Sequence, residues 1–224
     1  MLLAMVSKFT EIGWVGRRAL RKFILFLAST AIVLIASTAT GLEFSIHQNN
    51  SDKLNAILAE GEILPGDTAK LKELFHHMPQ KANDVLYLSS LGGSLYEGIL
   101  LGKFLAQSRI KTVVEGGSDC ASACALAFLG GRNRQGRAWR SASDNSRLGF
   151  HAFSRAGSQY QDENDTQRIV ADVLEYAHYV NAPIELMVKN FATPSHLIYW
   201  LSNVEVCSLG IKLWSNSLDK FICD

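Results

Sequence analysis

Apolar residues are arranged in different ways along this chain, and each arrangement predicts a different kind of segment. Residues 23–36 form an uncharged, largely apolar run near the N-terminus. Compact apolar groups at residues 85–89 and 110–115 are typical of buried strands, and residues 54–59 predict a strand or turn. Apolar residues recur at helical spacing over 68–76, 94–107 and 166–180. Because strands and helices alternate at short intervals, we expect βαβ units with parallel strands.

Particular residues mark the ends and faces of these elements. Asp67 stands where a helix N-cap is expected, before the helix at 68–76. Gly98 and Gly102 share one face of the helix at 94–107, which lets that helix approach the sheet closely. Residues 121–129 are almost wholly apolar and predict a short, buried helix that ends at Gly130.

The second half of the chain continues the same alternation. Residues 132–146 are polar and basic and predict a loop with a short strand, and residues 147–153 predict a strand that carries His151. A further helix is expected over residues 183–191, and a small helix and a final strand are expected between residues 200 and 214. Residues 40–224 are therefore expected to form one α/β domain.

The N-terminal 39 residues are different in kind. Five basic residues precede the apolar run at 23–36, and small residues follow it up to Ala39. This order is typical of a secretory signal, and we favour export with cleavage near Ala39. Counted through Leu42, the uncharged stretch is also long enough to remain as a membrane anchor over residues 23–42. The basic residues resemble a twin-arginine signal as well.

Charge separates the same two segments. Five of the 22 basic residues and one of the 21 acidic residues lie in residues 1–39, which leaves 17 basic and 20 acidic residues beyond them. A net charge of −3 over residues 40–224 gives no reason to expect a nucleic-acid partner. The apolar content of 48% excludes a disordered chain.

All four cysteines lie in the segment that we expect to be exported: Cys120, Cys124, Cys207 and Cys223. An even number of cysteines in an oxidising compartment favours disulfides. On one helix, Cys120 and Cys124 would lie one turn apart, which is unfavourable for a bond between them. We therefore expect one of these two to pair with Cys207 or Cys223; free thiols remain the alternative, and no metal site is expected.

Two short segments carry the candidate chemistry. The pair Gly92 and Gly93 follows a buried strand, and Ser122 stands at the start of a buried helix. His151 comes from a later strand. Exposed backbone N–H groups, a hydroxyl and an imidazole are together the parts of an acyl-transfer site.

These segments resemble the proteolytic subunit of the Clp protease family. The resemblance covers roughly residues 84–214 and includes the turn at 89–93, the segment Ala121-Ser122-Ala123 and the segment Gly149-Phe150-His151. It is closer to exported members with a C-x-S-A-C nucleophile segment. The resemblance implies a crotonase-like fold of stacked ββα units with a buried nucleophile helix, here preceded by the signal or anchor helix.

The same resemblance implies roles for individual residues. Ser122 would be the nucleophile, His151 the general base, and the N–H groups of Gly93 and Ala123 the oxyanion hole. The family's aspartate would fall at Ile198, so the third triad member is unknown. Other acidic residues could replace this aspartate, judged by residue type alone: Asp162, Asp165 and Glu185.

Two functions fit this pattern. The first is an exported serine hydrolase, in particular a peptidase that acts on a peptide or protein without a cofactor. The second is a catalytically inactive binding or assembly protein of the cell envelope, motivated by the missing acid. Acyl-CoA chemistry is disfavoured because it requires a cytosolic cofactor. Both leading functions predict a homo-oligomer in the periplasm or another extracytoplasmic space.

Overall fold

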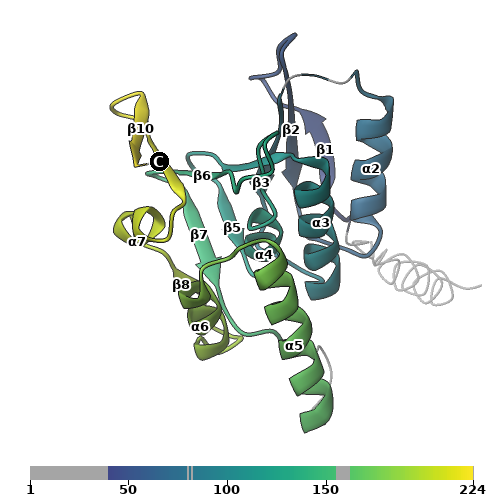
Figure 1. Cartoon of the computed structure of the whole chain (residues 1–224), viewed down its shortest axis with the longest axis vertical. Coiled ribbons are helices and arrows are strands. Elements are labelled where there is room, and N and C mark those ends of the chain that lie inside the picture. Colours follow the sequence, from purple (N-terminus) through teal and green to yellow (C-terminus); the bar gives the residue numbers. More distant parts are fainter. Residues whose placement is uncertain (1–39, 80, 82, 155–161, 224) are drawn as a thin grey trace, which may run out of the picture. The chain divides into compact units, whose positions relative to one another are not determined.

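The computed structural model describes residues 40–79, 81, 83–154 and 162–223, which form a mixed α/β domain (Figure 1). The expected signal or anchor at residues 1–39 lies outside this part of the chain. Within the described residues, no helix has the length and apolar character needed to cross a membrane. The strands are β1 (Glu43–Ile46), β2 (Leu54–Glu60), β3 (Asn83–Ser89), β4 (Lys111–Val114), β5 (Asp119–Ala121), β6 (Arg140–Ser143), β7 (Arg147–Phe150), β8 (Tyr199–Trp200), β9 (Lys212–Ser215) and β10 (Lys220–Cys223). The helices are α2 (Asp67–His77), α3 (Leu95–Ser108), α4 (Ala123–Phe128), α5 (Glu163–Tyr179), α6 (Ile184–Ala192) and α7 (Asn203–Ser208).

The larger sheet has seven strands in the order β1-β2-β3-β4-β6-β9-β10. Its five inner strands pair in parallel, as the alternation of strands and helices predicts. The antiparallel edge strands β1 and β10 are not predicted by the sequence. Both are four residues long and largely exposed, so neither carries the apolar run that marks a buried strand.

A second sheet has three strands, in the order β5-β7-β8. Strands β5 and β7 pair in parallel, with Cys120 beside Leu148 and Ala121 beside Gly149. Asp119 and Arg147 form an ion pair at the start of both strands. This small sheet positions the site, because β5 leads into Ser122 and β7 leads into His151.

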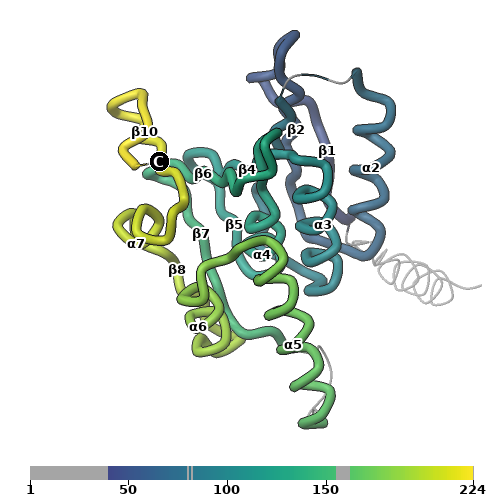
Figure 2. Tube along the Cα trace, in the orientation of Figure 1, coloured from purple at the N-terminus to yellow at the C-terminus, as the bar shows by residue number. Residues whose placement is uncertain are grey.

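The short helix α4 lies at the centre of the domain, against α3, β5 and β7 (Figures 1 and 2). All six of its residues are buried, which confirms the predicted buried helix, although Ala121 belongs to β5. Gly98 and Gly102 do face close neighbours, but these are helices and not the sheet as predicted: a Cβ on Gly98 would lie 2.5 Å from the carbonyl oxygen of Ala123, and Gly102 faces Tyr176 of α5. Glycine at position 98 therefore lets α3 and α4 touch backbone to backbone.

Asp67 has a different role from the predicted N-cap. It is the first residue of α2, and Gly66 occupies the N-cap with a φ of 102°. The buried carboxylate of Asp67 accepts hydrogen bonds from the backbone N–H groups of Leu42, at 2.9 Å, and Leu64, at 2.7 Å. It also pairs with Lys70. Asp67 therefore ties the chain before β1 to the start of α2.

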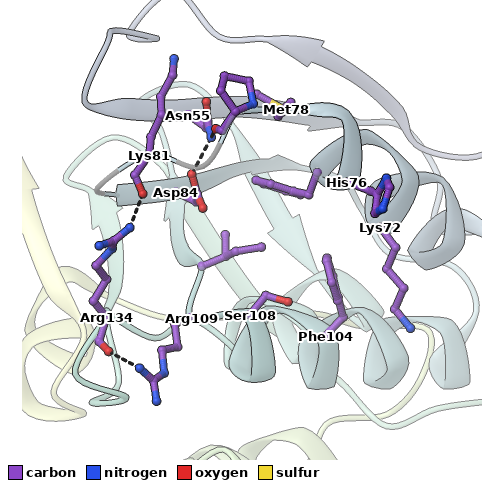
Figure 3. Close-up of a pocket in the computed structure, with 13 residues that line it drawn as sticks. Asn55, Lys72, His76, Met78, Lys81, Asp84, Phe104, Ser108, Arg109 and Arg134 are labelled. Atoms are coloured by element: carbon purple, nitrogen blue, oxygen red, sulfur yellow. Dashed lines mark hydrogen bonds between the residues drawn. The ribbon is translucent and has the colours of Figure 1, made fainter.

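A cavity of about 720 Å³ lies between α2, α3 and the beginnings of β3 and β4 (Figure 3). Aromatic rings from Phe75 and Phe104 line it, and burial raises the pKa of Asp84. Two arginines at its rim donate to backbone carbonyls, Arg109 to Arg134 and Arg134 to Lys81. The residues that line this cavity do not include Ser122 or His151, so it is separate from the predicted site.

Candidate functional site

Three strand ends bring the predicted site residues together. Beyond β3, Ser90 forms a parallel bridge with Cys120 of β5. Beyond β5, the N–H of Ser122 donates to the carbonyl oxygen of Gly149 in β7, at 3.1 Å. The three carboxyl ends therefore meet at one edge, where their side chains and free backbone groups can act on one ligand.

Ser122 occupies a strained turn between β5 and α4. Its φ is 58° and its ψ is −125°, a conformation that costs a non-glycine residue about 1–3 kcal/mol. Although Ser122 stands at the N-cap of α4, its hydroxyl makes no capping hydrogen bond. Such a turn places the side chain at the end of the strand, as in the nucleophile elbow of α/β-hydrolases.

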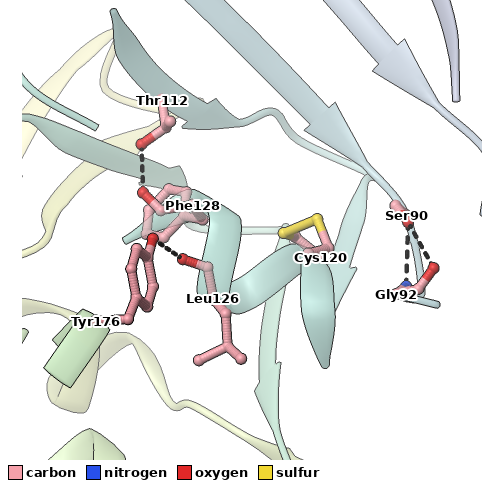
Figure 4. The surroundings of a disulfide bond; sticks show 8 residues. Ser90, Gly92, Thr112, Cys120, Leu126, Phe128 and Tyr176 are labelled. Carbon is pink, nitrogen blue, oxygen red and sulfur yellow. Dashed lines mark hydrogen bonds between the residues drawn. A yellow bond between two sulfur atoms is a disulfide. The ribbon is translucent and has the colours of Figure 1, made fainter. Parts of the chain in front are cut away.

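A disulfide joins Cys120 and Cys124 on either side of Ser122 (Figure 4). The prediction that these cysteines would not pair with each other is wrong. Cys120 lies on β5 and only Cys124 lies on the helix, and the turn at Ser122 brings their Cα atoms to 5.3 Å. This separation lies within the normal range for a disulfide. The bond therefore closes the turn that presents Ser122.

The second disulfide joins Cys207, in α7, to Cys223, in β10. The predicted bridge from Cys120 or Cys124 to one of these two residues is therefore also wrong. This disulfide closes a much longer loop, with a sequence separation of 16, and fastens the last strand to the rest of the domain. All four cysteines are in disulfides, so none is a free thiol.

The buried helix α4 is fixed at its other end by two side chains (Figure 4). The hydroxyl of Tyr176 donates to the carbonyl oxygen of Leu126 at 2.7 Å, and the hydroxyl of Thr112 donates to that of Phe128 at 2.8 Å. The same two carbonyls also accept from the backbone N–H groups of Leu129 and Gly131, each at 3.1 Å, so the hydroxyls add a second hydrogen bond to each. Burial raises the pKa of Tyr176, which keeps the phenol protonated and able to donate.

His151 follows the last residue of β7 and does not lie within the strand as predicted. Its Nδ1 is 2.8 Å from the carbonyl oxygen of Ala152. A carbonyl can only accept, so this contact places a proton on Nδ1 and leaves Nε2 as a proton acceptor. Within the described chain, no hydrogen bond joins His151 to Ser122 in this state.

No carboxylate of the described residues contacts His151. Ile198 lies beside Gly149, since a Cβ on that glycine would be 2.4 Å from Cγ2 of Ile198. The three substitutes by residue type lie elsewhere: Asp162 caps α5, Asp165 pairs with Arg168, and Glu185 is exposed on α6. The structure thus offers the Ala152 carbonyl where a triad would have an acid.

Two backbone N–H groups beside Ser122 have no acceptor within the described chain. Ile63 bonds to both neighbours of Gly93, accepting from Ser94 and donating to Gly92, so the N–H of Gly93 faces away from Ile63. The N–H of Ala123 is at the first position of α4, where no carbonyl of the helix can reach it. Both groups are therefore available to a ligand.

A cavity of about 260 Å³ joins these groups. Ser122, Ala123, Gly93 and His151 all line it. Sequence reasoning missed three further polar residues of its wall, Ser94, Ser154 and Asn190, of which Asn190 is only 3% exposed. A signal was present in the sequence, because Asn190 interrupts the apolar face of α6 that Leu186 and Met187 form.

Helix α6 is held beside the site by a polar cluster. Lys189 donates to Glu205 at 2.7 Å and to the hydroxyl of Tyr199 at 2.8 Å. Hydrogen bonds from Lys189, Tyr199 and Ser202 lower the pKa of Glu205 to about 2. Since Tyr199 pairs with Phe150, the residue before His151, this cluster connects α6 to the end of β7.

No protein-family model matches this chain, and no curated protein matches its sequence. Solved structures of other proteins resemble its fold, including two proteases. One is a mutant of the 1510-N membrane-bound stomatin-specific protease, with a TM-score of 0.51 and 16% identity, over 71% of this chain and 77% of the other. The second is ClpP1 from Listeria monocytogenes, with a TM-score of 0.52 and 20% identity, over 72% of this chain and 91% of the other. The described domain therefore has a Clp-protease-like α/β fold.

Proposed function

We propose that this protein is a serine hydrolase, and in particular a peptidase, with Ser122 as nucleophile and His151 as general base. The observation that carries the proposal is that the four groups needed for acyl transfer lie around one cavity. Ser122, His151 and the unpaired N–H groups of Gly93 and Ala123 border one cavity of about 260 Å³. The fold that it shares with two proteases supports the same reaction class.

The reaction follows from these groups. Oγ of Ser122 attacks the carbonyl carbon of a peptide bond, and its proton passes to Nε2 of His151. The N–H groups of Gly93 and Ala123 stabilise the oxyanion, each worth about 3–4 kcal/mol in comparable sites. The leaving amine takes the proton from His151, and a water activated by His151 then releases the acyl group from Ser122.

The Ala152 carbonyl takes part of the role of a triad acid. It holds His151 in the tautomer that can accept a proton at Nε2. A neutral carbonyl stabilises an imidazolium less than a carboxylate does, and loss of the acid costs a serine protease about 10⁴-fold in kcat. We therefore expect slow turnover, with acylation more readily detected than repeated cycles.

The setting that we propose is extracytoplasmic. Both disulfides favour an oxidising compartment. In this proposal residues 1–39 direct export or anchor the chain, residues 40–224 form the catalytic domain, and the chain belongs to the exported branch with the C-x-S-A-C segment. The substrate is a peptide or protein lying along the segment Gly92–Gly93 that follows β3, on the side opposite Ile63, and the protein forms a homo-oligomer.

One observation favours a second function, a binding or assembly protein without catalysis. His151 contacts no carboxylate of the described residues and does not bond to Ser122 in this state. In that case the cavity would hold a peptide without cleaving it.

Peptide hydrolysis separates the two functions. The full-length chain, Ser122→Ala and His151→Ala are compared on a mixture of unstructured peptides, with cleavage products identified by mass spectrometry. A peptidase cleaves peptides at a rate that both substitutions reduce at least a hundredfold. The proposal is rejected if wild type and Ser122→Ala form cleavage products at the same rate, or if none of the three proteins forms cleavage products.

A further inference from the structure

Asn190 contributes a buried amide to the wall of the candidate site. It is 3% exposed and lies on the buried face of α6. Within the described chain its amide has no hydrogen-bond partner. The amide atoms are not among the fully buried side-chain atoms that lack a partner, so they open into the cavity, where the hydrogen bonds that a buried amide normally makes to protein are missing. An amide that lines a cavity instead can form those bonds with a ligand.

The rest of the cavity wall defines what such a ligand would be. Apolar surface comes from Leu95, Leu126 and Phe153, two serines (Ser94 and Ser154) also line the cavity, and no aspartate, glutamate, lysine or arginine is among the lining residues. A volume of about 260 Å³ is smaller than the pockets of about 300–1,000 Å³ that hold drug-sized ligands. The cavity therefore suits one residue-sized group that carries no charge.

The position of this wall relative to Ser122 points to a selective role. Ser122 and Ala123 border the same cavity as Asn190, so a group inside it would be attached close to the carbonyl under attack. A role for Asn190 as the partner of His151 Nδ1 is less suitable, because that atom already bonds to Ala152.

We propose that Asn190 is the specificity-determining residue of this site. It selects a substrate whose side chain beside the reacting carbonyl ends in a neutral amide, as in glutamine. The apolar wall packs against the methylene groups, and the amide of Asn190 both donates to and accepts from the substrate amide. The inference rests on the proposed function, since it assumes that Ser122 attacks that carbonyl.

A charged side chain is disfavoured for a physical reason. Burying an ionised group without an opposite charge costs much more than burying an amide. A site built to bond a polar group also rejects an apolar analogue, because its own amide then stays unpaired. Glutamine should therefore be preferred over leucine, glutamate and lysine.

The test uses four fluorogenic peptides that differ only in the residue that supplies the reacting carbonyl: glutamine, leucine, glutamate or lysine. Values of kcat/KM are measured for the full-length wild type, Asn190→Leu and Asn190→Asp. Val188→Asp is the matched control, because Val188 is 62% exposed on the same helix and does not line the cavity. Ratios between peptides within one preparation are independent of the fraction of folded protein.

Wild type and Val188→Asp should prefer glutamine over each alternative by at least about tenfold. Asn190→Leu should lose the preference over leucine, and Asn190→Asp should raise lysine relative to glutamine by about tenfold. If the peptides are cleaved but neither substitution changes the ratios of kcat/KM between them, the inference is overturned and the proposed hydrolase function stands. Covalent labelling of Ser122 by a fluorophosphonate without cleavage of the glutamine peptide also overturns it. The absence of both labelling and cleavage would reject the proposed function itself.

Discussion

Gly92 lies directly against the candidate nucleophile. A Cβ added to Gly92 would be 2.6 Å from Cβ of Ser122 and 2.9 Å from the carbonyl oxygen of Ala121. Gly92 also has a φ of 107°, which side-chain-bearing residues rarely adopt. The turn after β3 therefore supports the turn after β5, and the backbone of one strand end sets the position of the hydroxyl at the other.

Gly92→Ala should move Ser122 and reduce kcat/KM for peptide hydrolysis by more than tenfold. The clash is with backbone and Cβ atoms that cannot rotate away, so the strand ends must separate. Gly136→Ala is the matched control, because Gly136 has a φ of 77° but a Cβ there would meet no atom within 4 Å. Equal effects of the two substitutions on kcat/KM would contradict the proposed role of this contact.

The two disulfides should have different effects when removed. Cys120 and Cys124 close the short turn around Ser122, so Cys120→Ala/Cys124→Ala should slow fluorophosphonate labelling of Ser122 by at least tenfold. Cys207→Ala/Cys223→Ala opens a longer loop, worth about 3 kcal/mol for 15 residues, and should lower Tm with labelling retained. Labelling rates and Tm values of both double variants provide the measurement. Unchanged labelling after loss of the first disulfide would show that it does not position Ser122.

Elements with a strong local pattern could be predicted from the sequence. The sequence predicts the strands β3 and β4 and the helices α3 and α5 correctly, because the spacing of their apolar residues indicates both the type of element and its buried face. The pairing of Cys120 with Cys124 could not be predicted in this way. It depends on the positive φ of Ser122, a backbone conformation that residue type does not reveal.

The site illustrates the same limit. Ser122, His151 and Gly93 were identified by resemblance, and they do border one cavity. The carbonyl of Ala152 and the amide of Asn190 were missed. A backbone carbonyl has no sequence signature. The apolar residues of α6 indicate a core-facing helix, and only the polar Asn190 among them suggests a site.

Tyr176→Phe should lower the free energy of unfolding by about 0.5–1.5 kcal/mol, because the buried carbonyl of Leu126 would lose the hydrogen bond from the hydroxyl and keep only the one from the N–H of Leu129. The ring itself is retained, so packing against α3 and α4 changes little. Denaturant unfolding of both proteins measures the difference. Tyr179→Phe is the control, since Tyr179 lies on the same helix and is 43% exposed. A loss no larger than that of the control would show that the hydrogen bond contributes little.

Glu205 should make stability depend on acid pH. Its pKa in the folded protein is about 2, below the usual value of 4.5, so its stabilising effect is complete above pH 4.5 and is lost as the pH falls towards 2. Wild type should therefore lose more stability than Glu205→Gln over this interval. The difference should be about 1 kcal/mol, because the pair with Lys189 is partly exposed. Thermal unfolding between pH 2 and pH 7 tests this, and parallel curves for the two proteins would contradict it.

The most direct measurement of the central claim is peptide mapping of the full-length chain after reaction with a fluorophosphonate. We predict one covalent adduct, on Oγ of Ser122, that His151→Ala slows at least a hundredfold and that Asp162→Asn leaves unchanged. An adduct on another residue, or labelling of Ser122 at the same rate without His151, would contradict the account.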